Sequence, residues 1–330
     1  MKVPSSLSCL LALSLSWGSV AGAVEPQAPG SEPQASAAES QASAPEPASP
    51  LPEPLLLPPQ TRLFLSSLTV VRYNPLGLET QNRLVYQRRL FDSSELLFRD
   101  TFASAAASLK ASPAYVKVGP MLELQPLTVL NLRAGYEYVR FFGTMGFLQS
   151  YPGPFHDFSD DVRDATRDGA YSTSGHHLLF EPTVQAKVKS VALRSKLAVE
   201  YWNVNLRDGA GGTFYDATLD TLVPGKGWVL ANDTDLLYLG GAWTVGARFS
   251  AVWPRYGEDA SLPANFKGNS HMRVGPLVAY SFHTRENSSF NRPTLLVIAG
   301  WYLQHPNRAE AMPYLLAGFS FSSDLMPSRR

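Results

Sequence analysis

The sequence predicts an all-β protein, a transmembrane antiparallel up-and-down β-barrel of about 12 strands. Apolar and polar residues alternate in segment after segment of the 330-residue chain, and this period of two is that of a β-strand. The connections between the segments alternate between short and long. Beyond the N-terminal leader, no stretch approaches the roughly 20 consecutive apolar residues that a membrane helix needs. A membrane-spanning chain of this kind has to cross as a closed set of strands.

The leader and the segment after it precede the predicted barrel. Lys2, the apolar residues 7–20 and the small residues 21–23 form a signal peptide over 1–23. Its removal leaves a chain without cysteine, which excludes disulfides and cysteine-ligated metal. Residues 24–60 are rich in Pro, Ala, Ser and Glu and contain no aromatic residue. They cannot bury enough apolar surface to fold, so we expect a disordered periplasmic tether before a barrel over 61–330.

The predicted strands of the barrel follow at fairly regular intervals. We place them at about 62–73, 83–91, 95–106, 114–125, 127–142, 177–189, 191–205, 227–239, 241–254, 270–284, 292–304 and 311–322. The first three are the least regular, because Asp100 would lie beside Phe98 and Phe102 on the apolar face, and Arg88 beside Tyr86. Nearly every odd-numbered connection is longer than the one after it, so one rim has long loops and the other has tight turns.

The clearest strand is 243–253. One face carries Trp243, Val245, Ala247, Phe249, Ala251 and Trp253, and the other carries Thr244, Gly246, Arg248 and Ser250. At about 3.3 Å per residue the two tryptophans stand roughly 33 Å apart along the strand. A tilt of about 45° brings this to ~23 Å, close to the ~25 Å apolar band of membrane barrels. We therefore expect an aromatic girdle that includes Trp243, Trp253, Tyr136, Tyr138 and Tyr280.

The opposite faces of the strands carry charges of both signs. These inward positions are Lys117, Glu123, Arg133, Glu137, Glu181, Lys187, Lys189, Arg194, Lys196, Glu200, Asp233, Asp235, Arg248 and Arg273, eight basic and six acidic. From these we predict a lumen wall of Arg133, Glu137, Arg194, Lys196, Glu200, Arg248 and Arg273. Such charges either pair with one another and fill the lumen, or line a path for solutes. If they line a path, Arg248→Glu should shift ion selectivity toward cations.

Two loop features suggest alternatives. Asp157, Asp160, Asp161, Asp164 and Asp168 would share one face of a helix, as a solvated acidic surface or as a site for a divalent ion or a basic ligand. Ser172, Ser174, His176 and His177 lie near the long-loop rim, where a serine hydrolase would need a serine within reach of a histidine. Adjacent histidines on a strand point to opposite faces, so at most one of them could serve.

We find no sequence motif for a catalytic, cofactor or metal site. His156, His271, His283 and His305 are scattered without metal-ligand spacing, and Gly209–Gly212 is not followed by a helix as a phosphate-binding loop would be. The barrel region carries a net charge of only about +4, from 27 basic and 23 acidic residues. This is too weak to predict nucleic-acid binding.

Together, the signal peptide, the alternating segments, the aromatic strand ends and the loop lengths make residues 61–322 resemble a Gram-negative outer-membrane β-barrel. This resemblance is to a class and not to a specific family. It implies an outer-membrane location, contact with outer-membrane lipid, and insertion by the barrel-assembly machinery. The leading functional hypothesis is a narrow porin-like channel or passive transporter of small polar or charged solutes. The alternatives are a structural or surface-interaction barrel with a closed lumen, a lipid hydrolase at the outer rim, and a secreted soluble β-sandwich.

Overall fold

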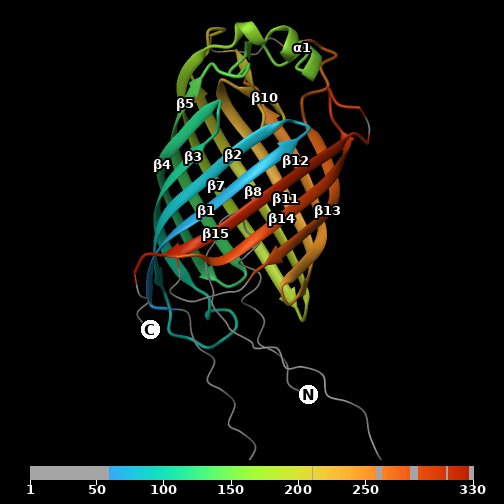
Figure 1. The fold of residues 1–330 in the computed structure, drawn as a ribbon. Helices are drawn as coiled ribbons and strands as arrows, with labels where there is room; N and C mark the ends of the chain where they lie inside the picture. The colour runs from blue at the N-terminus through green and yellow to red at the C-terminus, as the bar shows by residue number, and fades with distance from the viewer. Residues whose placement is uncertain (1–58, 210, 258–261, 283–288, 310, 327–330) are drawn as a thin grey trace, which may run out of the picture.

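The protein folds into a closed antiparallel β-barrel (Figure 1). The computed structural model describes residues 59–209, 211–257, 262–282, 289–309 and 311–326; the predicted signal peptide and nearly all of the predicted tether lie outside these residues. The barrel strands are β1 (Thr61–Tyr73), β2 (Gly77–Arg89), β3 (Phe102–Ala111), β4 (Tyr115–Leu127), β5 (Leu130–Phe142), β7 (Ser172–Val188), β8 (Val191–Val204), β11 (Lys226–Gly240), β12 (Trp243–Arg255), β13 (His271–Ser281), β14 (Asn291–Gln304) and β15 (Pro313–Asp324). Each strand pairs with the next along the barrel, and β15 pairs with β1. The predicted fold class is confirmed.

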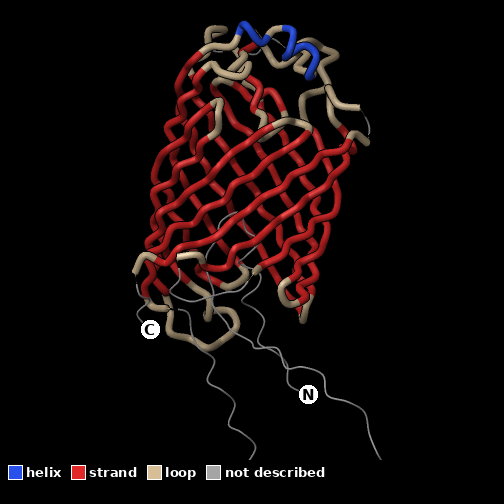
Figure 2. Tube along the Cα trace, viewed as in Figure 1, coloured by secondary structure: helices blue, strands red, loops and turns tan. Residues whose placement is uncertain are grey.

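The two ends of the barrel differ. β1 begins and β15 ends at one end, which we call the terminal end, and the longest connections lie at the other, the loop end (Figure 1). The connection 143–171 contains β6 (Ser150–Tyr151), α1 (Asp160–Ala165) and η2 (Arg167–Gly169), and 205–225 contains β9 (Thr213–Asp216) and β10 (Thr221–Pro224). Both helical segments cover the loop end, as Figure 2 shows. No helix in the described ranges is long and apolar enough to cross a membrane.

The expected alternation of loop lengths is present from residue 143 onward, but it is reversed at the start of the barrel. There, 74–76 forms a tight turn at the loop end and 90–101 a longer connection at the terminal end. The ranges that the sequence predicted for β2 and β3 were wrong. Thr80 and Asn82 make the outward face of β2 partly polar, and the outward face of β3 is mostly alanine, so neither strand shows a clear contrast between its faces. Pairing with β1 extends β2 back to Gly77. Asp100 consequently lies in a connection, beside Arg99 at 3.4 Å, and not on an apolar strand face.

The outward face of the barrel is apolar. Large apolar side chains are exposed on it around the circumference, among them Leu84, Val118, Leu122, Leu178, Phe180, Leu193, Leu236, Val245, Val297 and Leu315. A continuous belt of this kind is far larger than the apolar patches of soluble monomers. Since the sheet is closed and its apolar side chains point outward, the soluble β-sandwich alternative is wrong.

Two inward-facing glycines, Gly119 and Gly300, should respond differently to substitution by alanine. A Cβ at Gly119 would lie 1.9 Å from the carbonyl oxygen of Tyr136 on the neighbouring strand, whereas a Cβ at Gly300 would have its nearest neighbour at 3.7 Å. We expect Gly119→Ala to lower the free energy of unfolding by about 1–3 kcal/mol and Gly300→Ala to change it by less than about 0.5 kcal/mol. Urea unfolding in lipid vesicles measures both, and equal losses would contradict the close approach of β4 to β5.

Candidate functional site

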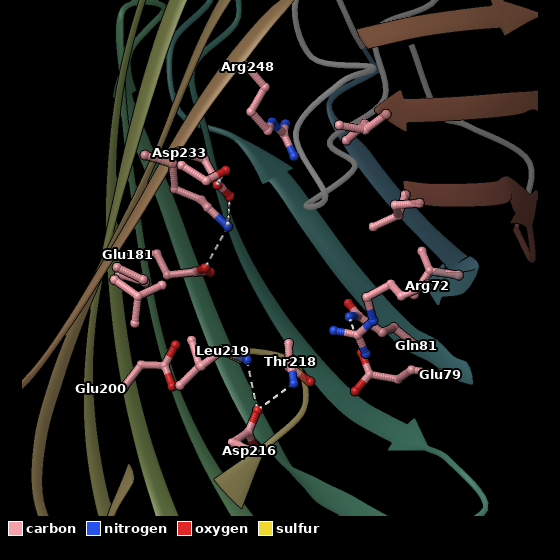
Figure 3. Close-up of a pocket in the computed structure, with 18 of the residues that line it drawn as sticks. Arg72, Glu79, Gln81, Glu181, Glu200, Asp216, Thr218, Leu219, Asp233 and Arg248 are labelled. Carbon is pink, nitrogen blue, oxygen red and sulfur yellow. Dashed lines mark hydrogen bonds and ion pairs between the residues drawn. The ribbon is translucent and has the colours of Figure 1, made fainter. Parts of the chain in front are cut away.

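The lumen contains a charged cavity near the middle of the barrel. Its volume is about 220 Å³, and side chains from the strands all around it form its wall (Figure 3). Its basic lining residues are Arg72, Arg83, Lys110, Lys117, Arg133, Lys196, Arg248 and Arg273, and its acidic ones are Glu79, Glu181, Glu200, Asp216 and Asp233. Because the strands alternate, these polar side chains face inward while their apolar neighbours face outward.

The seven side chains predicted for the lumen wall all occupy inward-facing strand positions. Five of them line the cavity: Arg133, Lys196, Glu200, Arg248 and Arg273. Glu137 and Arg194 are buried in the layer next to it, each 1% exposed. Among the other charges assigned to the inner face, Lys189 was placed wrongly, because it lies exposed in the turn between β7 and β8.

Sequence reasoning missed four charges of the cavity that come from the first three strands: Arg72, Glu79, Arg83 and Lys110. The ranges chosen for the second and third strands, 83–91 and 95–106, left out Glu79 and Lys110. The signal was present, since Glu79, Gln81 and Arg83 alternate with Thr80, Asn82 and Leu84. Asp216 was missed for another reason, because it belongs to a loop that folds into the barrel.

A chain of ion pairs crosses the wall from β5 to β11. Arg133 Nη1 donates to Glu181 Oε2 at 2.7 Å, and Lys196 Nζ lies 3.3 Å from the other oxygen of Glu181. Lys196 also lies 3.8 Å from Asp233 Oδ2, and Ser250 donates to Asp233 at 2.6 Å. The ion pairs link four strands, β5, β7, β8 and β11, and the hydrogen bond from Ser250 adds β12.

A second cluster, nearer the loop end, is centred on His177. Its two ring nitrogens lie 3.0 Å from Glu137 and 3.1 Å from Glu200. Lys110 pairs with the other Glu137 oxygen at 2.8 Å. The imidazole stacks on Trp202, with the ring centroids 4.0 Å apart. The histidine is thus a bridge between two carboxylates on the inner face.

This arrangement removes the geometric basis of the hydrolase alternative. Ser174 and His177 are three residues apart on β7, so their side chains point to opposite faces of the sheet. His176 faces outward, where its Nδ1 is 2.7 Å from the Tyr136 hydroxyl, and Ser172 accepts a hydrogen bond from Arg140. In the part of the chain that the structure describes, neither serine is hydrogen-bonded to a histidine.

A third cluster, nearer the terminal end, has one carboxylate for two guanidinium groups. Arg248 donates to both oxygens of Asp235, at 2.6 and 2.9 Å, and Arg194 donates to the same carboxylate at 2.7 Å. Asp235 is 0% and Arg194 1% exposed. Arg248 is therefore held in a fixed position by a bidentate pair, and it is less free than the sequence suggested.

At the loop end the lumen is closed by β9, β10 and the turn between them, residues 213–224, which we call the inserted hairpin. Its apolar side chains Phe214, Leu219 and Val223 pack against inward-facing residues at the loop ends of the strands, including Val139, Phe141, Trp202, Val204, Val229 and Val252. The turn of the hairpin points into the barrel, where Asp216, Thr218 and Leu219 form part of the cavity wall (Figure 3). Asp216 Oδ1 accepts hydrogen bonds from the backbone nitrogens of Thr218 and Leu219, which stabilises this turn.

Asp220, at the end of that turn, anchors the inserted hairpin to the barrel. Arg308, from the connection between β14 and β15, donates to both of its carboxylate oxygens at 2.6 and 2.9 Å. Tyr215 and Tyr302 donate to the same carboxylate at 2.7 and 2.5 Å, and His305 Nε2 lies 3.3 Å from it. We call these five residues the Asp220 latch. Asp220 is 1% exposed, so water does not reach its carboxylate.

The latch should resist acid. Burial alone would raise the pKa of Asp220, but hydrogen bonds and charge from His305 and Arg308 hold its pKa well below the ordinary value of 3.8. A depressed carboxylate pKa adds stability that is complete above the unfolded-state pKa, near 3.9, and is lost only as the pH falls through the folded-state pKa. Conductance in planar bilayers should therefore show the same open fraction at pH 7 and pH 4. A rise at pH 4 would show that the latch does not hold the hairpin.

The acidic loop is solvated, as one of the two interpretations of its sequence predicted, because Asp157, Asp160, Asp161, Asp164 and Asp168 are all exposed. The five aspartates do not share a helix face, since α1 spans only Asp160–Ala165. Asp157 accepts a hydrogen bond from Asn307 at 2.7 Å, and Asp160 pairs with Arg308 at 3.1 Å. Among the described residues, no group of three or more His, Cys, Asp or Glu side chains could hold a metal ion. Asp157 and Asp160 also join this loop to the connection between β14 and β15, which carries Arg308.

Side chains also fill the lumen near the terminal end. Leu237, Leu239, Leu277, Ala279 and Ile298 form a buried cluster on one side of it. Phe64 and Gln125 are fully buried among the inward-facing residues of β1 and β4. The charged cavity is thus bounded by the inserted hairpin on one side and by packed side chains on the other.

Comparisons with known proteins place this chain only loosely. No family model and no curated protein matches it. Among solved structures, the NanC porin matches 79% of this chain and 100% of its own at 10% identity, with a TM-score of 0.36. The translocator domain of the autotransporter NalP from Neisseria meningitidis matches 80% and 88% at 10% identity and a TM-score of 0.38. The outer membrane protein OprD from Pseudomonas aeruginosa matches 82% and 95% at 8% identity and a TM-score of 0.31. At these values the likeness carries no argument about function.

Proposed function

We propose that the protein is an outer-membrane β-barrel that passes small polar or charged solutes through a narrow lumen, with the inserted hairpin as its gate. The observation that carries this proposal is the charged cavity of about 220 Å³ in the middle of the barrel. A loop segment closes the cavity at the loop end, and loop segments can move without opening the barrel wall.

The outward face supports the membrane location. Trp243 and Tyr280 pack together at the terminal end, with ring centroids 4.7 Å apart. Tyr201 and Trp228 pack at 4.9 Å near the loop end, where Trp253 also lies. Tyr136 and Tyr138 are exposed toward the same end. Aromatic residues at both edges of an apolar belt match the girdles of membrane barrels. The loop end would face the exterior and the terminal end the periplasm, where the tether and the barrel-assembly machinery would act.

Planar-bilayer recording of the purified full-length protein tests the proposal. We expect discrete conductance steps that are small and infrequent, because the hairpin and the packed terminal end restrict the lumen. Steps absent from the wild-type protein and also from a variant with a broken latch would contradict a channel.

The second candidate is a barrel with a permanently closed lumen that acts through its loop surface. The observation that favours it is the extent of ion pairing, since Glu137, Glu181 and Asp235 each contact two cationic or imidazole groups. Such a barrel would give no conductance steps in planar bilayers, whichever residue of the Asp220 latch is replaced. It would also keep its solvated acidic loop, in which Asp161, Asp164 and Asp168 remain exposed, as a surface for a basic partner.

A further inference from the structure

The outward face of the barrel carries polar and positively charged side chains in one sector of the loop end. On five neighbouring strands, a polar or basic residue follows an aromatic one at the next outward position toward the loop end. These pairs are Tyr138 and Arg140 on β5, His176 and Ser174 on β7, Tyr201 and Asn203 on β8, Trp228 and Lys226 on β11, and Trp253 and Arg255 on β12. Because alternate residues of a strand share a face, each polar side chain lies on the loop-end side of the aromatic girdle.

The outward strand positions in the rest of the loop end do not show this pattern. On β14, Trp301 is followed by Leu303, which is also exposed. The outward positions nearest the loop end on β1, β2, β3, β4, β13 and β15 are Tyr73, Leu78, Ala111, Val116, Met272 and Pro313, none of them charged. The positive charge of the outward strand positions is therefore concentrated between β5 and β12.

Lys226 and Arg255 are the closest pair of cations in this sector. Trp228 lies directly opposite Arg255, and Lys226 comes two residues before Trp228. The two cations are therefore diagonal neighbours, with Cα atoms roughly 7–8 Å apart. Both are exposed, and among the described residues neither side chain has an ion pair or a hydrogen bond. None of the outward-facing residues on these five strands is an aspartate or a glutamate.

An aromatic and apolar surface continues from this pair toward the middle of the barrel. Trp228 is 48% exposed and packs on Tyr201, with the ring centroids 4.9 Å apart. Leu230 follows on the same face of β11, and Trp253 lies directly opposite it on β12. A ligand that fits this surface has an anionic head at Lys226 and Arg255 and an apolar chain that lies along the belt.

We propose that Lys226 and Arg255 bind the phosphate of a phosphorylated lipid in the outer leaflet, with its acyl chains against Trp228 and Leu230. A lysine supplies a point charge and an arginine a fork that matches two phosphate oxygens. Arg140, three strands away, extends the positive sector but lies too far from Lys226 to share one phosphate. The proposal rests on the outer-membrane location proposed above, but the lipid site does not require conduction.

Native mass spectrometry of the purified full-length protein in non-ionic detergent tests this binding. The micelles contain dioleoyl phosphatidic acid, dioleoyl phosphatidylcholine or oleate at equal concentration. We expect the wild-type protein to bind phosphatidic acid about tenfold more tightly than the other two, because choline offsets the charge of one and the other has no phosphate. Inorganic phosphate at the same concentration should not displace phosphatidic acid, because it has no acyl chain. Displacement would assign the site to free phosphate and contradict a lipid site.

The double variant Lys226→Gln with Arg255→Gln should lower the affinity for phosphatidic acid by about tenfold or more. Lys226→Arg keeps the charge and should retain the preference for phosphatidic acid over phosphatidylcholine. The matched control is Arg88→Gln. Arg88 is also exposed on the outward face, two residues from Tyr86, but it lies at the terminal end, and its cross-strand neighbours Thr61 and Ala103 are uncharged. All four residues of these variants are at exposed outward positions, so heat-modifiable migration on gels should stay that of the wild type.

Two further results would overturn the proposal: equal affinities of the wild-type protein for phosphatidic acid and phosphatidylcholine, or equal losses in the double glutamine variant and in Arg88→Gln. These results are distinct from failure of the proposed function. A barrel without conductance steps can still show the lipid preference. A protein that stays soluble without detergent would contradict the membrane location itself.

Discussion

Replacing Arg308 with alanine should release the inserted hairpin and raise the open fraction of the barrel in planar bilayers. Arg308 supplies both hydrogen bonds of the bidentate pair with Asp220, which is 1% exposed. Removing one partner of a buried ion pair costs about 3–5 kcal/mol, and the low end applies here because Tyr215, Tyr302 and His305 stay in contact with Asp220. The barrel strands do not depend on this pair, so we expect the cost to favour withdrawal of the hairpin rather than unfolding. With about 1.4 kcal/mol for each factor of ten, a cost of about 3 kcal/mol or more should raise the open fraction at least about a hundredfold.

Two further variants show whether the charge of Asp220 is the cause. The double variant Arg308→Ala with Asp220→Asn leaves no buried charge, so its open fraction should fall back toward that of the wild type. Arg207→Ala is the control in the same connection between β8 and β11, since Arg207 stacks on Tyr171 at 3.8 Å and has no part in the latch. If Arg308→Ala and Arg207→Ala give indistinguishable recordings, the latch does not control the lumen.

Strands with large apolar residues at their outward positions could be predicted from the sequence. β2, whose outward face is partly polar, and β3, whose outward face is mostly alanine, could not. β12 was placed within two residues, since Trp243, Val245 and Phe249 alternate with polar neighbours. β2 was shifted by six residues at its start, because Thr80 and Asn82 face outward and remove the contrast between the two faces. Its true range is fixed by long-range pairing with β1 and β3, which local alternation does not contain.

The candidate site was also predictable only in part. Alternation identifies which charges face inward, but not their partners. Asp235 on β11 lies directly opposite Arg248 on β12 and directly opposite Arg194 on β8. This register depends on how the strands pair, which the sequence of a single strand does not contain. The inserted hairpin also escaped prediction, because the sequence analysis left residues 206–226 as a connection between two predicted strands and gave them no strand of their own. The run from Thr213 to Pro224, with its buried Phe214, Leu222 and Val223, was the local signal that this loop packs inside.

The sequence analysis offered Arg248→Glu as a test of ion selectivity, but the ion pair between Arg248 and Asp235 complicates that test. It would place a second carboxylate beside Asp235 and leave Arg194 as the one ion-pair partner of Asp235 among the described residues. A change in selectivity would then be mixed with a change in folding. Arg273 has no carboxylate partner among the described residues and lines the same cavity, so its reversal reports on the solute path with less structural disturbance.

The largest loss of stability should come from Asp235→Ala. This carboxylate is fully buried and is the partner of both Arg194 and Arg248. Without it, two buried guanidinium groups of like charge face each other across β11. Leaving a buried charge unpaired costs about 3–5 kcal/mol, so we expect the free energy of unfolding in lipid vesicles, measured with urea and tryptophan fluorescence, to fall by at least that amount.

Asp233→Ala, two residues away on the same face of β11, is the matched control. Its ion-pair partner Lys196 still has Glu181 at 3.3 Å, and the side chain of Asp233 is 23% exposed. The loss should therefore stay near 1 kcal/mol, the order of a single exposed pair. Equal losses for the two aspartates would mean that the shared carboxylate gives no special stability. If only Asp235→Ala lowers the free energy of unfolding by about 3 kcal/mol or more, the buried carboxylate shared by Arg194 and Arg248 stabilises the terminal side of the lumen.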